Sequence, residues 1–275
     1  MESLIRVGLL GCGSIGTTIV EALYKDSSIN AEILYLFDGE PGKAERLQTK
    51  IKRELVVTSS FEDFTNAPFD LLLECASQEA VRSYGEKALR AGKDLLIMSV
   101  GALMDDAFRN RLASVAKEVS KNLYLPSGAI GGLDILRAAK EGKLYEVNLI
   151  TSKNPSALAG APYFQEHAMD PDEIQNRMTL FEGTAKEAVK LFPANVNVAA
   201  ILSLAGLGGE KTKVKIVADP QLKINIHQIE IKGDFGEAKI TVQNLPHPEN
   251  PKTSYLAALS AIETLRRACA KGPRL

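Results

Sequence analysis

The sequence predicts an α/β protein with two domains: an N-terminal domain built on a doubly wound parallel sheet, and a second domain of α+β structure. Three observations support this fold class. An apolar run, Leu4 to Leu10, leads into a glycine-rich turn at residues 11–16, Gly-Cys-Gly-Ser-Ile-Gly. A helical pattern and a second apolar run, Ala31 to Phe37, come next. Short apolar segments then alternate with helical ones as far as Leu125, as in a parallel sheet covered on both faces.

The glycine-rich turn has the spacing of a dinucleotide-binding site. Gly11 makes the tight turn, Gly13 lets the backbone approach a pyrophosphate, and Gly16 lets the helix pack closely on the strand. The pyrophosphate would lie on the free N–H groups at the start of that helix, where Ser14 and Ile15 stand. A tight turn alone also explains three glycines, but the order of strand, turn, helix and second strand predicts a Rossmann-type domain.

An acidic residue at the end of the second apolar run bears on the choice of cofactor. Asp38 follows the turn by about twenty residues, where a carboxylate accepts hydrogen bonds from a ribose diol. Such a carboxylate favours NAD, because it repels the 2′-phosphate of NADP. Lys43 and Arg46 follow closely and can compensate for that repulsion. The sequence therefore predicts NAD or NADP as the cofactor.

The three cysteines, Cys12, Cys75 and Cys269, lie far apart in the chain and lack metal-ligand spacing. This argues against a disulfide framework and against a metal site, and it is typical of a cytoplasmic protein. Cys75 and Ala76 follow a predicted strand, Asp70 to Glu74, at the carboxyl edge of the sheet, where they would face the cofactor. A buried and inert thiol is the alternative for Cys75.

The composition excludes several classes of protein. The formal net charge is -1 with 24% charged residues of mixed sign, so no basic field attracts nucleic acid or an anionic membrane. A hydrophobic content of 45% over 275 residues can build two cores. Neither a signal sequence nor a membrane-spanning apolar segment is recognisable. We therefore expect a cytoplasmic protein whose partner is a small molecule rather than nucleic acid or membrane.

A turn-rich stretch at residues 126–132 separates the two predicted domains. We place a dinucleotide-binding Rossmann domain at residues 1–125 and a substrate-binding and catalytic domain at residues 126–249. A helix-start signal at Asn250 predicts a long amphipathic helix over the C-terminal segment, residues 250–275, which can pack back on the first domain.

The second domain reads as helices over a largely antiparallel or mixed sheet. Its strands are predicted at Leu144 to Thr151, Lys213 to Ala218, Ile224 to Lys232 and Glu237 to Gln243. Gly233 to Gly236 suggests a hairpin between the last two strands, and Thr184 with Glu187 has capping-box spacing. The segment Lys153 to Asp172 contains three prolines and predicts a long loop.

His227 is the candidate catalytic residue. Hydride transfer to or from a nicotinamide needs a proton acceptor for the substrate, and histidine is the usual choice near neutral pH. His167 and His247 lie in predicted loops and are expected to be solvated. His227 falls within a predicted strand, on the same face as Ile229, where a titratable ring needs a partner. The spacing also fits a core histidine that is satisfied by a carbonyl group.

Several polar residues are candidates for holding the substrate or the nicotinamide. Asn195 and Asn197 stand at the start of an apolar helix, where Asn195 can cap the helix or hold a carboxamide or carboxylate. If the substrate is a dicarboxylate, Lys252 and Lys153 are candidate cations, with surface solvation as the alternative for each. The glycine-rich residues 127–132 let the backbone approach a flat ring, or they form an interdomain turn.

Five segments together resemble the L-aspartate dehydrogenase family, and they are spread over nearly the whole chain. They are Cys75 to Gln78 (CASQ), Pro126 to Asp134 (PSGAIGGLD), Phe192 to Ala200 (FPANVNVAA), Ile224 to Glu230 (INIHQIE) and Asn250 to Leu259 (NPKTSYLAAL). The resemblance implies a two-domain, homodimeric enzyme that oxidises L-aspartate with NAD or NADP. The product, iminoaspartate, would hydrolyse to oxaloacetate and ammonia or feed NAD biosynthesis.

Carried over position by position, the family's active-site histidine corresponds to His227. Its cofactor-binding alanine and asparagine correspond to Ala129 and Asn195. The segment Lys153 to Glu173 is bulkier than the family pattern, which bears on the substrate rather than the cofactor. Two other classes remain open: a dehydrogenase of the homoserine or dihydrodipicolinate type, and a non-catalytic module that senses dinucleotides.

Overall fold

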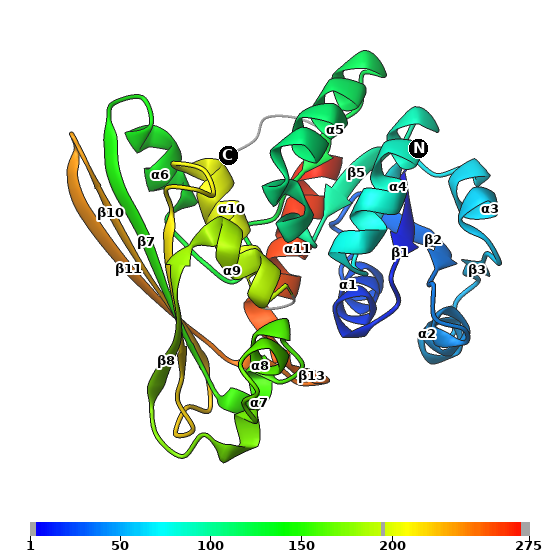
Figure 1. Cartoon of the computed structure of the whole chain (residues 1–275). Helices are drawn as coiled ribbons and strands as arrows, with labels where there is room; N and C mark the ends of the chain where they lie inside the picture. The colour runs from blue at the N-terminus through cyan, green and yellow to red at the C-terminus, as the bar shows by residue number, and fades with distance from the viewer. Residues whose placement is uncertain (1–3, 194–195, 271–275) are drawn as a thin grey trace. The chain divides into compact units, whose positions relative to one another are not determined.

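The computed structural model describes residues 4–193 and 196–270, and these divide into two compact units (Figure 1). The first unit comprises the described residues up to Pro126 together with those from Ala258 onward. The second unit runs from Ser127 to Ala257. Residues 250–257, which the sequence assigned to the C-terminal helix, thus lie in the second unit.

The first unit contains a six-stranded parallel sheet. Its strands are β1 (Ile5–Leu10), β2 (Ala31–Phe37), β3 (Val56–Val57), β4 (Leu71–Glu74), β5 (Asp94–Ile97) and β6 (Leu123–Tyr124). They are arranged in the order β3-β2-β1-β4-β5-β6. The order reverses between β1 and β4, which defines the doubly wound Rossmann topology and confirms the predicted fold class.

Helices cover both faces of this sheet (Figure 1). They are α1 (Ser14–Lys25), α2 (Lys43–Ile51), α3 (Phe61–Asn66), α4 (Gln78–Arg90), the 3-10 helix η1 (Val100–Met104) and α5 (Asp106–Glu118). Contacts join α1 to α2, and α4 to both α3 and α5. The predicted cap of α4 is present, since the Ser77 side chain accepts a hydrogen bond from Ala80 N at 3.1 Å.

The last helix, α11 (Tyr255–Cys269), contributes most of its length to the first unit. Asn30 Nδ2 donates to the Cys269 carbonyl at 3.2 Å, and the Arg266 guanidinium binds the Asp26 carboxylate at 2.6 Å. Ala261 and Leu265 are fully buried. These contacts fasten the C-terminal helix to the connection between α1 and β2.

The second unit is built on a five-stranded mixed sheet in the order β11-β10-β7-β9-β8. Its strands are β7 (Leu144–Lys153), β8 (Met178–Thr184), β9 (Lys213–Ala218), β10 (Asn225–Gly233) and β11 (Gly236–Asn244). A small sheet pairs β12 (Pro246–His247) with β13 (Asn250–Ser254). The predicted hairpin is confirmed, because Gly233 pairs with Gly236 across β10 and β11.

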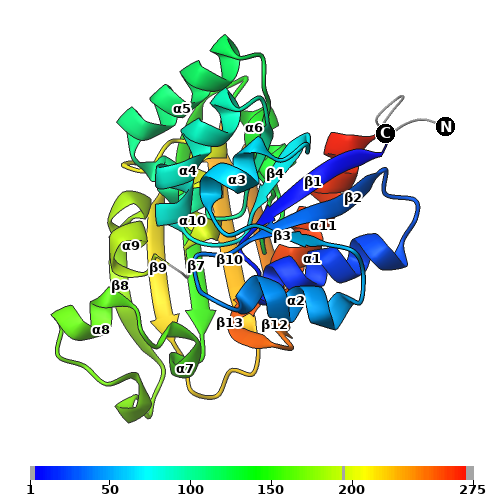
Figure 2. The ribbon, with the colours of Figure 1, turned by 90° about the vertical axis from the view of Figure 1, so that its right-hand side faces the viewer.

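Helices α6 (Leu133–Ala139), α9 (Ala185–Leu191) and α10 (Asn197–Ala205) lie against one face of this sheet (Figures 1 and 2). In the described part of the chain, no helix lies on the opposite face (Figure 1). The predicted capping box begins α9, with Thr184 and Glu187 exchanging hydrogen bonds. Helix α10 begins at Asn197 with Val196 at its N-cap; Asn195, the predicted cap, lies outside the described residues.

The predicted helix start at Asn250 is wrong. Residues Asn250–Ser254 form strand β13, and α11 begins five residues later, at Tyr255. Pro246 pairs with Ser254 and His247 with Asn250, so tertiary pairing overrides the local helix signal in this segment. Lys252 is consequently on a strand.

The predicted long loop is partly helical. Strand β7 extends to Lys153, and the segment beyond it contains α7 (Pro155–Leu158), α8 (Pro162–Glu166) and the 3-10 helix η2 (Pro171–Glu173). Each proline stands at the beginning of one of these helices, where a missing N–H costs nothing. Asn154 caps α7 by accepting from Ser156 N at 3.1 Å. Among the described residues, no helix is long and apolar enough to cross a membrane.

Candidate active site

The glycine turn of the first unit leaves no room for a side chain at Gly11 or Gly16. Gly11 has a φ of +99°, and a Cβ there would lie 2.6 Å from Ala76 N. A Cβ at Gly16 would lie 2.4 Å from the Gly11 carbonyl oxygen. The loop after β4 therefore packs directly on the turn after β1, which brings the predicted residues Gly11 and Ala76 together.

Gly13 differs from these two glycines, because a Cβ there would meet no protein atom within 4 Å. Gly13 is the N-cap of α1 and lacks a side chain that could hydrogen-bond the first N–H groups, which belong to Ser14 and Ile15. Free N–H groups and a positive dipole end form a site for an anion, and the open space leaves room for it. The turn therefore fits a dinucleotide pyrophosphate.

Asp38 is held in a fixed orientation at the end of β2. Its carboxylate accepts hydrogen bonds from Cys12 N at 2.7 Å and from Glu40 N at 2.8 Å. The acid thus lies against the glycine turn, as an acid that binds the adenosine ribose should. Lys43, a candidate for compensating the charge of Asp38, binds Glu40 at 2.6 Å.

Glu74 is a buried carboxylate that the sequence analysis did not single out. It stands at the end of β4 and accepts from Ala76 N at 2.8 Å, Ser99 N at 2.9 Å and Ser99 Oγ at 2.9 Å. Burial raises the pKa of Glu74, and these hydrogen bonds oppose that rise. Glu74 therefore ties the loop after β4, which carries Cys75 and Ala76, to the loop after β5.

Two thiols close to the glycine turn, Cys12 and Cys75, are unsuited to nucleophilic chemistry. Burial raises the pKa of Cys12 to about 12, and it raises the pKa of Cys75 well above its ordinary value. Both thiols are therefore protonated near neutral pH, and a protonated thiol is a poor nucleophile. This supports the inert alternative for Cys75.

His227 lies on β10 in the second unit and is 2% exposed. Its Nδ1 is 3.0 Å from Thr151 Oγ1, and the two residues are direct register partners on adjacent strands. Burial, and secondarily the charge of Lys153, lower the pKa of His227 to about 3. The ring is therefore neutral near pH 7, with one nitrogen held by the threonine hydroxyl.

Lys153 stands two residues after Thr151 on β7, so both side chains project to the face of the sheet that carries His227. It is 4% exposed, and its Nζ donates to the Lys252 carbonyl at 3.2 Å. Burial lowers the pKa of Lys153 to about 8. The structure thus places this lysine at a strand end beside the histidine rather than in a loop.

Two buried asparagines fix the surroundings of this face. Asn244 Nδ2 donates to the Ala129 carbonyl at 3.0 Å, which holds the glycine-rich segment at 127–132 on the end of β11. Asn225 Nδ2 donates to Ser254 Oγ at 3.1 Å, which holds β13 beside β10. Ala129 itself is buried.

The remaining predicted residues are placed as follows. Lys252 is exposed, and its Nζ donates to the Ala159 carbonyl at 3.2 Å. Asn197 begins α10 and is half-buried. His167 is exposed, as expected, and its Nδ1 lies 2.8 Å from the Tyr163 carbonyl oxygen. His247 was expected to be solvated as well, but it is buried and accepts from Glu249 N at 3.1 Å.

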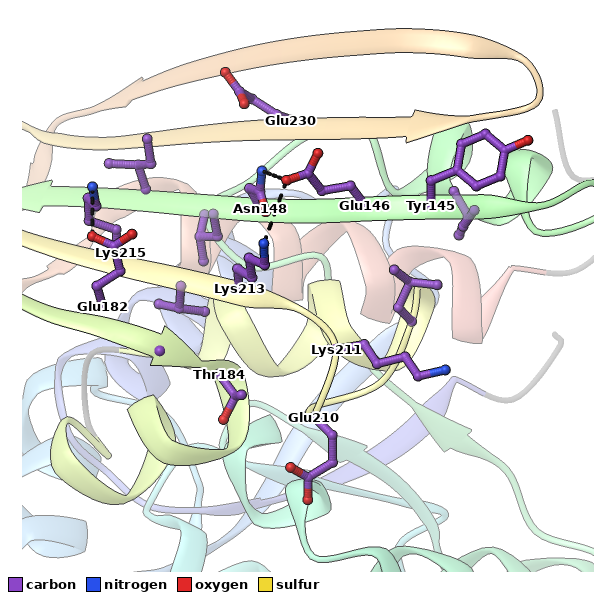
Figure 3. Close-up of a pocket in the computed structure, with 16 residues that line it drawn as sticks. Tyr145, Glu146, Asn148, Glu182, Thr184, Glu210, Lys211, Lys213, Lys215 and Glu230 are labelled. Atoms are coloured by element: carbon purple, nitrogen blue, oxygen red, sulfur yellow. Dashed lines mark hydrogen bonds and ion pairs between the residues drawn. The ribbon is translucent and has the colours of Figure 1, made fainter.

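A hollow of about 760 Å³ lies elsewhere in the second unit (Figure 3). Its charged lining includes Glu146, Glu182, Glu230, Lys213 and Lys215, which come from strands β7 to β10. Glu230 is three residues from His227 on β10, so its side chain projects to the opposite face of the sheet. The hollow is therefore separate from the histidine site.

Within residues 4–193 and 196–270, no cluster of side chains is suited to hold a metal ion.

Two family models match consecutive parts of the chain. Residues 11–126 match the family model described as homoserine dehydrogenase, NAD binding domain, and residues 134–268 match that described as aspartate dehydrogenase, C-terminal. The match to the NAD-binding family and the fit of the glycine turn identify NAD or NADP as the cofactor and the chain as an NAD(P)-dependent dehydrogenase.

Several known proteins match this chain over nearly its whole length. The L-aspartate dehydrogenase of Methanosarcina barkeri is 47% identical over 96% of this chain and 97% of its own, and that of Nitrosopumilus maritimus is 44% identical over 96% of each. The crystal structure of aspartate dehydrogenase from Thermotoga maritima has a TM-score of 0.75 and 31% identity, covering 99% of this chain and 100% of that one. A homoserine dehydrogenase from Thiobacillus denitrificans shares the fold at 16% identity and a TM-score of 0.60. The chain belongs to the L-aspartate dehydrogenase family.

Proposed function

We propose that this protein oxidises L-aspartate to iminoaspartate with NAD or NADP, and that water then converts the imine to oxaloacetate and ammonia. The observation that carries the proposal is the buried His227, held by Thr151 beside Lys153 in the part of the chain that matches the aspartate dehydrogenase C-terminal family. An unprotonated imidazole can accept a proton, and a neighbouring ammonium group suits an anionic substrate.

The first unit would hold the cofactor through three groups. The N–H groups of Ser14 and Ile15 would bind the pyrophosphate in the space left by Gly13. Asp38 would accept hydrogen bonds from the ribose hydroxyls, and Ala76 would lie beside the turn in the loop that Glu74 fastens. When bound, the nicotinamide supplies the chemistry of hydride transfer, taking the hydrogen and its electron pair from Cα of the amino acid.

The residues of the second unit would manage the protons. Aspartate carries an ammonium group, which must lose a proton before its nitrogen can share an electron pair with Cα. His227 is neutral and can take that proton, while Thr151 keeps the ring in one orientation through Nδ1. Once it has released that proton to solvent, the same imidazole can accept a proton from the water that attacks the imine. These two roles use one base at successive steps.

A substrate panel tests the activity. We expect reduction of NAD or NADP that depends on L-aspartate, and none with L-homoserine or with a dihydrodipicolinate-type reaction assayed in reverse. Rates measured with NAD and NADP in parallel give the preference, for which Asp38 predicts NAD. Nucleotide binding without turnover of any amino acid would favour a dinucleotide-sensing module instead.

We also propose a homodimer that forms through the sheet face without helices. This face carries residues of both charges, and several of them are paired: Lys232 and Lys213 with Glu146, and Lys215 with Glu182. A surface of alternating charge can match a second copy of itself about a two-fold axis. Sedimentation of the wild type and of Ile150→Asp, in the middle of this face, tests the proposal: a dimer for the first and a monomer for the second.

Two further expectations belong to the same proposal. A cytoplasmic location is consistent with the three described cysteines, which are free thiols. Iminoaspartate hydrolyses in water unless another enzyme consumes it, and the family resemblance implies NAD biosynthesis as that route. A coupled assay tests the NAD-biosynthesis route. In that assay a second enzyme should trap the imine before oxaloacetate accumulates.

A further inference from the structure

Two basic side chains are buried side by side on one face of the second sheet. Thr151 and Lys153 alternate along β7, and His227 lies opposite Thr151 on β10. Lys153 is 4% exposed and His227 is 2% exposed. The strand register places Lys153 diagonally opposite His227, and the charge of Lys153 disfavours protonation of the imidazole.

The elements packed around Lys153 carry both basic and acidic side chains. His227 stands on β10. On β13, the Lys252 carbonyl accepts a hydrogen bond from the Lys153 ammonium, and Lys252 Nζ donates to the Ala159 carbonyl. Asp219, which follows β9, binds Lys153 through the backbone, and its carboxylate accepts from Gln221 N at 3.0 Å. Helix α7, residues 155–158, carries no titratable side chain.

Burying an ammonium group is costly for the fold, because moving a charge from water into a protein costs several kcal/mol even after relaxation. An exposed lysine could be replaced without loss, whereas this one lies on the face that carries the candidate base. A bound carboxylate would offset the cost, since it pairs with the ammonium through charge-assisted hydrogen bonds.

We propose that Lys153 binds a carboxylate of the amino-acid substrate and so places the substrate's amino group at His227. The inference rests on the proposed function, and it assigns a residue to one of the two substrate carboxylates. In aspartate the two carboxylate carbons are only one and two bonds from the carbon that bears the amino group. A carboxylate on Lys153 therefore keeps the amino nitrogen within reach of the neighbouring imidazole.

Binding should be coupled to the uptake of a proton. With a pKa of about 8, Lys153 is largely neutral at pH 9 in the free protein. A bound carboxylate favours the charged form and raises that pKa, so the lysine takes a proton from solution. His227, with a pKa of about 3, stays neutral at pH 9, and exposed lysines are already charged. The same carboxylate offsets the charge that Lys153 exerts on His227, which raises the basicity of the imidazole.

Calorimetry with succinate tests the proposal without turnover. Succinate has the two carboxylates of aspartate and lacks the amino group, so it binds without reacting. Titration into the full-length protein with NAD present, at pH 9 in two buffers of different ionisation enthalpy, gives the number of protons taken up. We expect uptake approaching one proton per site in the wild type. Lys153→Met should weaken succinate binding at least tenfold and abolish the uptake.

Lys153→Arg separates charge from titration. Arginine stays protonated at pH 9, so this variant should bind succinate within about tenfold of the wild type but without proton uptake. Lys140→Met, an exposed lysine at the end of α6, is the matched control and should behave as the wild type does. If Lys153→Met does not fold, the wild type and Lys153→Arg still give the decisive comparison.

Three results would overturn the proposal: no binding of succinate by the wild type, binding without proton uptake, or equal affinity in the wild type and Lys153→Met. Oxidation of L-aspartate by the wild type is measured separately. If the wild type oxidises aspartate and Lys153→Met retains the wild-type KM, the role of Lys153 fails while the proposed function stands. If succinate binds as expected and aspartate is not oxidised, the proposed function fails and the anion site remains.

Discussion

Thr151 Oγ1 lies 3.0 Å from His227 Nδ1, across two neighbouring strands whose register places the two residues directly opposite each other. The pairing fixes the imidazole through one nitrogen and leaves Nε2 as the nitrogen for proton transfer. Because strand register determines the contact, the sheet itself orients the candidate base.

Thr151→Val should lower kcat while leaving nucleotide binding unchanged. Valine keeps the shape of threonine but loses the hydroxyl, and a lost hydrogen bond of about 1 kcal/mol corresponds to about a fivefold slower reaction. Initial rates with saturating aspartate measure the change. Thr179→Val, at an exposed position on β8, is the matched control. Equal rates for Thr151→Val and the control would show that the hydroxyl does not orient a catalytic ring.

Gly11→Ala and Gly13→Ala should fail in different ways. At Gly11 a Cβ would lie 2.6 Å from Ala76 N and the φ is +99°, so the substitution should destabilise the fold. At Gly13 the φ is -76° and the space is open, so the protein should fold normally but bind the dinucleotide at least tenfold more weakly. Thermal unfolding and nucleotide titration distinguish the two effects. If Gly13→Ala bound the nucleotide as tightly as the wild type does, the pyrophosphate would not lie at this turn.

Glu74→Gln should weaken cofactor binding and lower stability. The carboxylate accepts from Ala76 N, Ser99 N and Ser99 Oγ, whereas an amide presents one oxygen acceptor and two donors. A buried group left without its partner costs about 1–3 kcal/mol. Glu118→Gln, on the surface of α5, is the control. Nucleotide affinity that falls no more than in the control would mean that the fastened loop is not part of the cofactor site.

Burial of His227 predicts a loss of stability in acid. Its pKa is about 3 in the folded protein and about 6.5 as a free side chain, so the unfolded chain binds more protons between these values. The stabilisation is complete above pH 6.5 and is lost as the pH falls toward 3, by up to about 1.4 kcal/mol per pH unit. Urea unfolding of the wild type and His227→Gln from pH 7 to pH 4 should therefore give a shallower pH dependence for the variant. Parallel curves would contradict the neutral buried ring.

Much of the first unit could be predicted from sequence because its signals are local. The glycine spacing, the apolar runs and Asp38 each depend on neighbours within one strand-turn-helix unit, and the topology follows from the alternation of strands and helices. Glu74 was missed because an acid that ends an apolar strand looks like an ordinary polar strand end. The serine that binds it, Ser99, is 25 residues away.

The second unit was less predictable because its signals are not local. Pro155 and Pro162 indicate a loop by their local pattern, although each begins a short helix. Asn250 carried a helix-start signal, yet pairing with His247 makes it part of a strand. Burial of Lys153 likewise depends on β13, which lies about one hundred residues further along the chain. Contacts at that separation leave no periodic pattern around either residue.

The most direct test compares the wild type with His227→Ala for aspartate-dependent reduction of NAD and of NADP, with nucleotide affinity measured on the same samples. We expect the wild type to reduce at least one nucleotide and His227→Ala to do so at least about a hundredfold more slowly, with unchanged nucleotide affinity. No reduction by the wild type, or equal rates in the two proteins, would contradict an aspartate dehydrogenase that uses this histidine as its base.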